Sequence, residues 1–199
     1  MRALILLPII HSPADLGTLS AAAEASRDDA QTLQYLDAVD QFWTVVADVI
    51  ESMNLNYQQL KVYQDSLPVC NAVDHIVAEV AASGSKNYAL LKTLQENGAT
   101  LMGTESPDLL EQEKALMTDV LQSADHSKEL AEKGKDLLSR RDGFIGQRIS
   151  ESLADEEMGL IFVGLMHDIE PHISSDIVVI KPLGEPTSSG SGVITESGV

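Results

Sequence analysis

The chain has 199 residues, 44% of them apolar, which is enough for one well-buried core and short for two. Its 31 acidic and 13 basic residues give a formal net charge of −18, which argues against DNA, RNA or an anionic membrane as a partner because phosphate binding requires clustered Lys and Arg. The same excess of carboxylates suits the binding of cations.

Cysteine content and hydropathy predict the compartment. Cys70 is the single cysteine, so an internal disulfide is excluded and a reducing cytosol is compatible with the sequence. The apolar run at residues 2–10 lacks a small-x-small cleavage site, and no run approaches the ~18 to 20 residues of a membrane span. We therefore expect a cytoplasmic protein without a signal peptide or membrane segment.

Short apolar runs alternate with helical patterns in the first half of the chain. The clearest helix covers 39–50, where apolar residues that include Phe42 and Trp43 recur on one stripe. Ser85 is placed to cap a helix that ends at Asn97-Gly98. The elements predicted in this half are strands at 2–10 and 60–63 and helices at 21–34, 39–50, 72–82 and 86–97.

The same alternation continues in the second half. Ser106-Pro107-Asp108 is a strong helix-start signal, and the run M-G-L-I-F-V-G at 158–164 suits a strand that is buried on both faces. Gly134 and Gly143 are the points at which the longest predicted helix could break. The elements predicted in this half are strands at 99–103, 158–164 and 176–183 and helices at 106–121 and 127–153.

The order of these elements predicts the fold class. Strands separated by helical segments indicate an α/β fold with a mostly parallel sheet flanked by helices. We expect a single domain over residues 1–183. Residues 184–199 are rich in Ser, Gly and Thr and cannot bury enough surface to order themselves, so we predict a flexible tail there.

Three predicted strands each lead into a residue that can bind a metal or a proton. His11 follows the first strand, Glu105 follows the strand at 99–103, and His167 follows the strand at 158–164. If the strands are parallel, these side chains leave the same edge of the sheet. Two imidazoles and a carboxylate with an open position form a catalytic zinc or iron set, so we predict a divalent ion, zinc, iron or manganese, and no nucleotide cofactor.

Each of these residues also has a purely structural interpretation. A histidine after a strand is often a hydrogen-bonded loop residue, and Glu105 could serve only to favour the positive end of the following helix. Further polar residues lie at the predicted strand ends, and we assign them a substrate-binding role. They are Asp15, which could instead be a helix cap, Asp168, which could be a solvated loop acid, and Gln64 and Asp65, which end the strand at 60–63.

Two arginines stand on or beside the apolar stripe of the helix at 127–153. Arg141 lies three and four residues after Leu138 and Leu137, and Arg148 lies four after Phe144. A bare charge facing the sheet costs roughly several kcal/mol, so each guanidinium should meet carboxylates or water. Both are candidates to stabilise negative charge that develops on a substrate. The alternative is a local ion pair with Asp142 or Glu151.

Several segments together resemble a known family. They are the strand that ends at His11, G-S-K-N-Y-A-L-L-K-T-L-Q-E-N-G-A-T-L-M-G-T-E at 84–105, R-R-D-G-F-I-G-Q-R-I at 140–149, and G-L-I-F-V-G-L-M-H at 159–167. This order resembles the TraB/Tiki superfamily, which is similar in turn to erythromycin esterase and the ChaN haem-binding proteins. The resemblance covers most of residues 2–180.

The resemblance implies which positions are functional. Members carry a Gly-x-x-His near the first strand, an acidic residue after a middle strand, a helical arginine and a second Gly-x-x-His after a hydrophobic strand. The matching positions are His11, Glu105, Arg141 and His167, although Pro8 stands where the first motif has glycine. Tiki members are described as metal-dependent proteases, and other members as esterases or as regulators without established activity.

These observations predict a metal-dependent hydrolase with a small-molecule or peptide substrate. His11, His167 and a carboxylate would hold the ion, and Glu105 would be either a ligand or the general base. A second hypothesis is a non-catalytic regulatory protein that binds a small ligand or anion against the arginines in the same crevice. A third is an assembly protein that forms homo-oligomers through the aromatic helix at 39–50.

Overall fold

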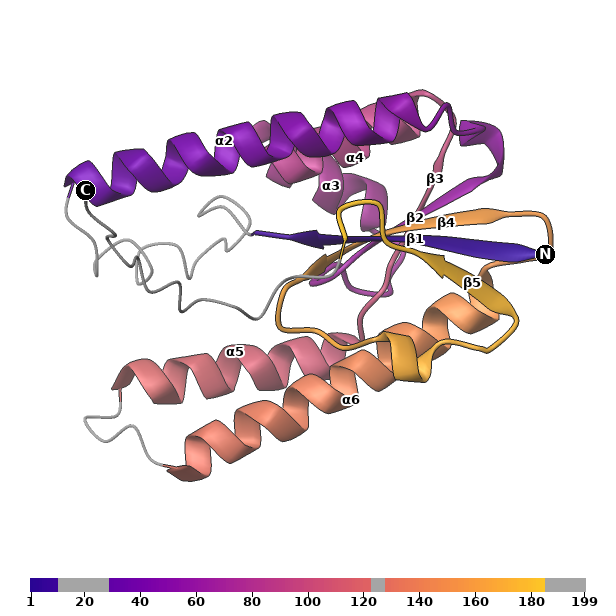
Figure 1. Ribbon diagram of the computed structural model, residues 1–199. Coiled ribbons are helices and arrows are strands. Elements are labelled where there is room, and N and C mark those ends of the chain that lie inside the picture. The colour runs from indigo at the N-terminus through magenta and orange to yellow at the C-terminus, as the bar shows by residue number, and fades with distance from the viewer. Residues whose placement is uncertain (11–28, 123–127, 185–199) are drawn as a thin grey trace, which may run out of the picture.

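The structure is a computed structural model that describes residues 1–10, 29–122 and 128–184. A single sheet of five parallel strands in the order β3-β2-β4-β1-β5 lies between two layers of helices (Figure 1). The predicted α/β class with a parallel sheet is therefore confirmed. The strands are β1 (Arg2–Ile9), β2 (Leu60–Gln64), β3 (Thr100–Met102), β4 (Met158–Gly164) and β5 (Ile177–Ile180).

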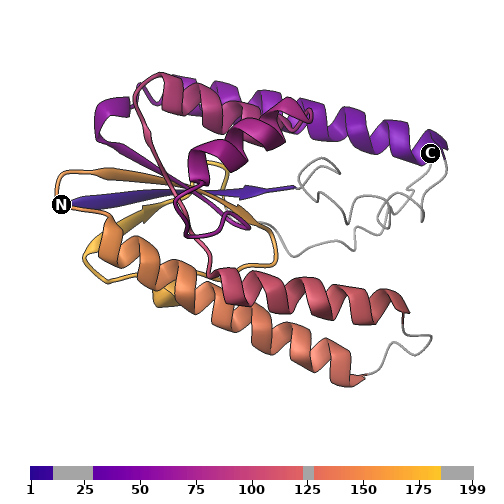
Figure 2. The same ribbon diagram turned by 180° about the vertical axis from the view of Figure 1, so that it is seen from behind.

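In the described ranges, five α-helices cover the two faces of this sheet. They form one layer on each face, as the front and back views show (Figures 1 and 2). The first layer holds α2 (Asp29–Ser52), α3 (Val73–Ala82) and α4 (Lys86–Glu96), and the second holds α5 (Pro107–Gln122) and α6 (Lys128–Ser152). Two short 3-10 turns, η2 (Tyr57–Gln59) and η3 (Glu170–His172), complete the described elements. Within these ranges, none of the helices has the length and apolar character needed to cross a bilayer.

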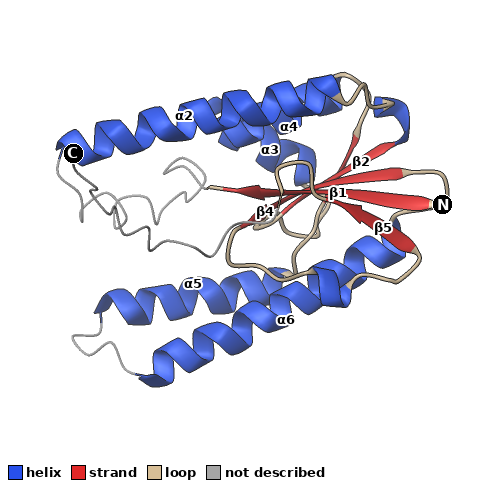
Figure 3. Ribbon diagram, in the orientation of Figure 1, coloured by secondary structure: helices blue, strands red, loops and turns tan. Residues whose placement is uncertain are grey.

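Most of the predicted elements match observed ones, with differences at their ends. The separation of the helices predicted at 21–34 and 39–50 is wrong, because α2 runs without a break over Asp29–Ser52. Residues 21–28 of the first of these predicted helices lie outside the described ranges. The longest predicted helix, α6, continues without a break through Gly134 and Gly143 (Figure 3). The side chain of Ser85 accepts a hydrogen bond from the backbone N–H of Tyr88, which confirms it as the cap of α4. The predicted tail at 184–199 stays a prediction because the structure describes only its first residue.

The aromatic stripe of α2 packs on the sheet of its own chain. The ring of Trp43 lies 6.1 Å from the ring of Phe162 in β4, and Val46 and Ile50 are buried beside it. The stripe is therefore not exposed as the oligomer interface that the assembly hypothesis requires. On the other face, Ile145 and Ile149 of α6 pack against the sheet in a second core.

Two basic side chains from the strands hold the C-terminal end of α6. Arg2 of β1 donates to the carbonyl oxygens of Ser150 and Leu153 at 2.5 and 2.8 Å, and Lys61 of β2 donates to the carbonyl of Ser152 at 2.5 Å. Cations at this end of a helix satisfy its unpaired carbonyls and oppose its negative dipole. These contacts fix the position of α6 along the sheet.

Gly146 allows η3 to pack closely on α6. A Cβ atom at this position would lie 2.5 Å from the Cβ of His172 and 2.7 Å from its carbonyl group. We therefore expect Gly146→Ala to lower the free energy of unfolding by about 1–3 kcal/mol through overpacking. Gly134→Ala is the matched control, because its Cβ would meet only Leu116 at 3.8 Å and alanine favours the helix by about 1 kcal/mol. Urea denaturation measures both, and equal stability of the two variants would contradict the packing argument.

The strand order makes the carboxyl end of β4 a topological switch point. β4 lies between β2 and β1, and its chain continues into η3 on the side of α6. The neighbouring strands are followed instead by α3 and α2, which cover the opposite face (Figure 1). Connections that diverge in this way open a crevice outside the carboxyl ends of the strands, where α/β proteins bind ligands.

Candidate functional site

Five buried ionisable side chains meet at this edge of the sheet, and we name them the carboxyl-edge cluster. Asp65, Glu105 and His167 follow β2, β3 and β4, and Arg141 and Asp142 come from α6. The four acidic and basic residues are between 0 and 5% exposed, and the His167 side chain is 6% exposed. Buried charges require partners, so the contacts within the cluster determine its chemistry.

Glu105 forms a buried bidentate ion pair with Arg141. Arg141 donates from Nε to Oε2 at 2.9 Å and from Nη2 to Oε1 at 2.5 Å. Its Nη1 donates to Glu113 of α5, and the backbone N–H of Ser66 donates to Glu105 at 3.1 Å. The expectation that Arg141 meets carboxylates is confirmed, and the carboxylates are those of Glu105 and Glu113 and not the local ones, Asp142 or Glu151, of the alternative interpretation.

The pKa values of Arg141 and Glu113 are both raised, for different reasons. Burial alone would lower the pKa of Arg141, but the hydrogen bonds and charge of Glu105, with the charge of Glu113, outweigh burial and raise it. Burial raises the pKa of Glu113, which is only partly offset by the charge of Arg141. The guanidinium is therefore permanently charged and held between two carboxyl groups.

His167 lies between two carboxylates. Its Nδ1 is 2.5 Å from Oδ1 of Asp142, and its Nε2 is 3.7 Å from Oδ2 of Asp65. The backbone N–H of Asp168 donates to the other oxygen of Asp142 at 3.1 Å, and that of Gly164 donates to Asp65 at 2.7 Å. Both carboxylates are thus oriented by the loop that carries the histidine.

The two contacts of His167 differ in kind. The short contact with Asp142 places a proton on Nδ1, whereas 3.7 Å is too long for a hydrogen bond between Nε2 and Asp65. A neutral imidazole in this tautomer directs the lone pair of Nε2 towards a carboxylate, which is repulsive. The pair is favourable only when Nε2 is protonated or when a cation lies between the two atoms.

The remaining predicted residues lie around the cluster or outside the described part. Gln64 is buried, donates to Asp65 at 2.9 Å, and has a side-chain oxygen without a hydrogen-bond partner in the described ranges. Arg148 donates to the carbonyl of Gly103 at 3.2 Å, just beyond β3, and Asp168 is exposed. His11 and Asp15 lie outside the described residues.

Sequence reasoning missed the roles of Asp142 and Glu113. Asp142 precedes the buried Ile145 and Ile149 by three and seven residues, so helical spacing places it on the buried stripe of α6. Glu113 follows the buried Leu109 by four residues in α5 in the same way. A carboxylate on an apolar stripe is the signal that could have identified both.

The described residues contain no group of three or more His, Cys, Asp or Glu side chains suited to hold a metal ion. Within these ranges, the facing Nε2 of His167 and Oδ2 of Asp65 are the pair closest to such an arrangement. The third predicted ligand, His11, comes after β1. Ile9 of β1 pairs with Gly164 of β4, so the first described range, residues 1–10, ends beside the loop that carries His167.

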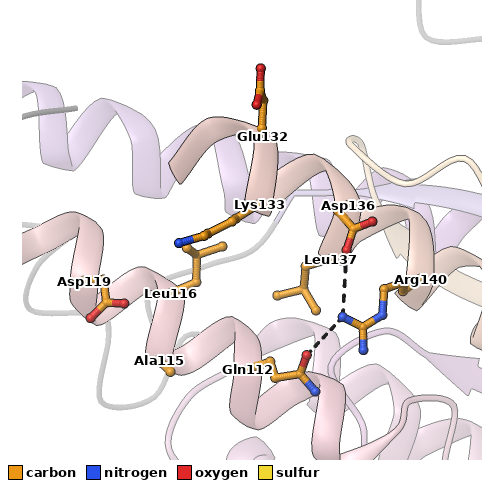
Figure 4. Close-up of a pocket in the computed structure, with 9 residues that line it drawn as sticks. All are labelled: Gln112, Ala115, Leu116, Asp119, Glu132, Lys133, Asp136, Leu137 and Arg140. Carbon is orange, nitrogen blue, oxygen red and sulfur yellow. Dashed lines mark hydrogen bonds and ion pairs between the residues drawn. The ribbon is translucent and has the colours of Figure 1, made fainter. Parts of the chain in front are cut away.

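Two cavities bear on the choice of site. A cavity of about 470 Å³ lies between α5 and α6 (Figure 4), and it is lined by none of the predicted residues. Its Arg140 is already paired with Gln112 and Asp136, and Glu132 points away from the others. A smaller cavity of about 200 Å³ is lined in part by His167 and therefore adjoins the cluster.

Comparisons with known proteins identify no relative of this chain. No family model matches the chain, no curated protein matches it, and no solved structure matches it. The resemblance to the TraB/Tiki superfamily accordingly stays a prediction, and the carboxyl-edge cluster is the feature of the described residues that bears on function.

Proposed function

We propose that the protein is a metal-dependent hydrolase whose divalent ion is held at the carboxyl-edge cluster by Asp65 and His167, with His11 as a third ligand. The observation that carries the proposal is the 3.7 Å separation of Nε2 of His167 and Oδ2 of Asp65. In this proposal Asp65 takes the place of Glu105 as the carboxylate ligand, because both oxygens of Glu105 accept hydrogen bonds from Arg141.

The geometry of this pair fits a shared ion. Zinc binds imidazole nitrogen and carboxylate oxygen at about 2.0–2.2 Å, so two ligands of one ion can be up to roughly 4 Å apart. The observed 3.7 Å lies within that reach and beyond hydrogen-bonding distance. A cation there would also remove the repulsion between the lone pair of Nε2 and the carboxylate of Asp65.

Three neighbouring groups support the ligands. Asp142 holds the proton on Nδ1 of His167 and so keeps Nε2 available, as carboxylates commonly do for metal-binding histidines. The N–H of Gly164 fixes Oδ2 of Asp65. Arg141 neutralises Glu105, so a bound divalent ion would not have to balance the charge of that carboxylate as well.

A bound divalent ion would supply Lewis acidity for hydrolysis of a carbonyl or phosphoryl centre. The chain supplies orientation, through the Asp142–His167 contact, and a positive charge buried near the ligands, through Arg141. Arg148, half-buried at the end of β3, is the second cation that could face negative charge on a substrate.

The anion-binding alternative receives less support from these contacts. It requires a guanidinium that can face an anion, whereas Arg141 already donates to Glu105 and Glu113. The cluster also contains more carboxylates than cations, which opposes an anionic ligand. The proposal of a cation is preferred for these two reasons.

Metal titration tests the proposal directly. Zn²⁺, Mn²⁺ and Fe²⁺ are titrated into chelator-treated protein by calorimetry, and we expect Asp65→Asn and His167→Gln each to weaken the tightest binding by at least about 10- to 100-fold. His75→Gln is the matched control, because His75 is exposed and pairs only with Glu79 on α3. Equally weak binding in all four proteins would contradict the proposal. Hydrolysis of ester, peptide and phosphoester probes with and without chelator then tests the reaction.

A further inference from the structure

The edge of the sheet beside β1 is incomplete near its carboxyl end. β5 pairs with β1 only from Arg2 to Ile5, whereas β4 pairs with β1 as far as Ile9. Figure 1 shows β1 continuing past the end of β5. The outer side of residues 6–9 therefore has no neighbouring strand in the described part of the chain. Pro8 lacks an N–H and is suited to such an edge.

A cavity of about 200 Å³ lies at this end of the sheet, and it is lined by residues of β1 and β4, of the loop after β4 and of the segment after β5. Its floor is apolar and is formed by Leu6 of β1, Val163 of β4 and Ile169 of the following loop, all of which are buried. Polar groups stand at its border, where Lys181 is paired with Glu170. An apolar floor with a few polar groups is the usual composition of a small-molecule site.

Size and charge limit what this cavity can hold. Its volume is below the roughly 300–1,000 Å³ of sites for drug-sized ligands, so it suits one part of a ligand rather than a whole molecule. The ammonium of Lys181 is matched by Glu170, and Asp168 adds a further carboxylate to the lining. The cavity therefore does not favour an anionic group, and a neutral apolar group is the best match.

His167 connects the cavity to the carboxyl-edge cluster. Its side chain lines the cavity and also faces Asp65 and Asp142. We propose that the cavity binds the neutral apolar group of the substrate, either a short acyl chain or a single apolar amino-acid side chain, and so places the adjoining carbonyl beside His167. The role in substrate binding rests on the proposed hydrolase function, while the binding of an apolar group does not.

Binding of n-alcohols to metal-free protein tests the apolar specificity alone. Ethanol, butanol, hexanol and octanol are titrated in turn, and the shifts of backbone amide signals are followed by NMR. We expect the shifts to concentrate at residues 6–7, 163–170, 181 and 183–184, and affinity to rise about fourfold per added methylene until the cavity is full. Shifts that are scattered over the surface, or affinity independent of chain length, would overturn the proposal.

Leu6→Phe extends a side chain of the floor into the cavity and should abolish alcohol binding. Val178→Phe is the control, because it adds a ring at an exposed position of β5, and it should leave binding unchanged. Unchanged affinity in Leu6→Phe would overturn the proposal, even if metal titration succeeds. Conversely, alcohol binding by a protein that binds no divalent ion would overturn the assignment of the cavity to a hydrolase substrate. Alcohol binding at this cavity together with a cation at Asp65 and His167 is the supporting result.

Discussion

Arg141→Met is expected to lower the free energy of unfolding by about 3–5 kcal/mol, because it leaves the carboxylate of Glu105 buried without its counter-charge. Glu105 is 0% exposed, and both of its oxygens accept hydrogen bonds from Arg141. The backbone N–H of Ser66 also donates to this carboxylate, but a neutral amide cannot replace a guanidinium. Urea denaturation at neutral pH measures the loss.

Two further variants separate the ion pair from the general effect of losing an arginine. Arg140→Met changes the neighbouring residue, whose side chain is 50% exposed and pairs with Asp136, so the change should be within about 1 kcal/mol. The double variant Glu105→Gln/Arg141→Met removes both charges and should recover part of the loss. If Arg141→Met is no more harmful than Arg140→Met, the buried pair does not stabilise the fold in the way that its geometry indicates.

The sequence predicts the fold well because its signals are local. The apolar runs that become β1 and β4, and the stop and start signals at Asn97-Gly98 and Ser106-Pro107, each act within a few residues. The parallel arrangement then follows from the alternation of strands and helices. It places the residues after β2, β3 and β4 on one edge, as predicted.

The partners within the site could not be predicted because they depend on the order of the strands. Glu105 follows β3, which is separated from β4 by β2, whereas Asp65 follows β2 and is therefore next to the loop of His167. Sequence reasoning ranked Glu105 above Asp65 as a metal ligand because it could not know this order. The contacts of Asp142 and Glu113 likewise depend on how α5 and α6 lie on the sheet.

Part of the excess negative charge of the chain is buried in the carboxyl-edge cluster. The excess of carboxylates is not confined to solvated faces, because three of them, Asp65, Glu105 and Asp142, are buried at one edge of the sheet. One is neutralised by Arg141, and the other two face opposite nitrogens of His167. A single imidazole between two carboxylates is a place that suits a proton or a metal ion.

Asp142→Asn should weaken divalent-ion binding by about 10- to 100-fold without removing a ligand, as is usual for the carboxylate that orients a metal-binding histidine. The amide keeps the shape of the side chain and can still accept from the N–H of Asp168, so the fold should be retained. What changes is the charge that holds the proton on Nδ1 of His167.

The ¹⁵N shifts of the imidazole distinguish this positioning role from a structural one. In the wild-type protein they should show Nδ1 protonated, and in Asp142→Asn they should show a mixture of tautomers. Asp136→Asn makes the same substitution at an exposed position of α6 and should change neither the tautomer nor the metal affinity. A wild-type affinity in Asp142→Asn would mean that Nε2 of His167 is not directed at an ion. The Asp142–His167–Asp65 arrangement would then be an imidazolium held between two carboxylates.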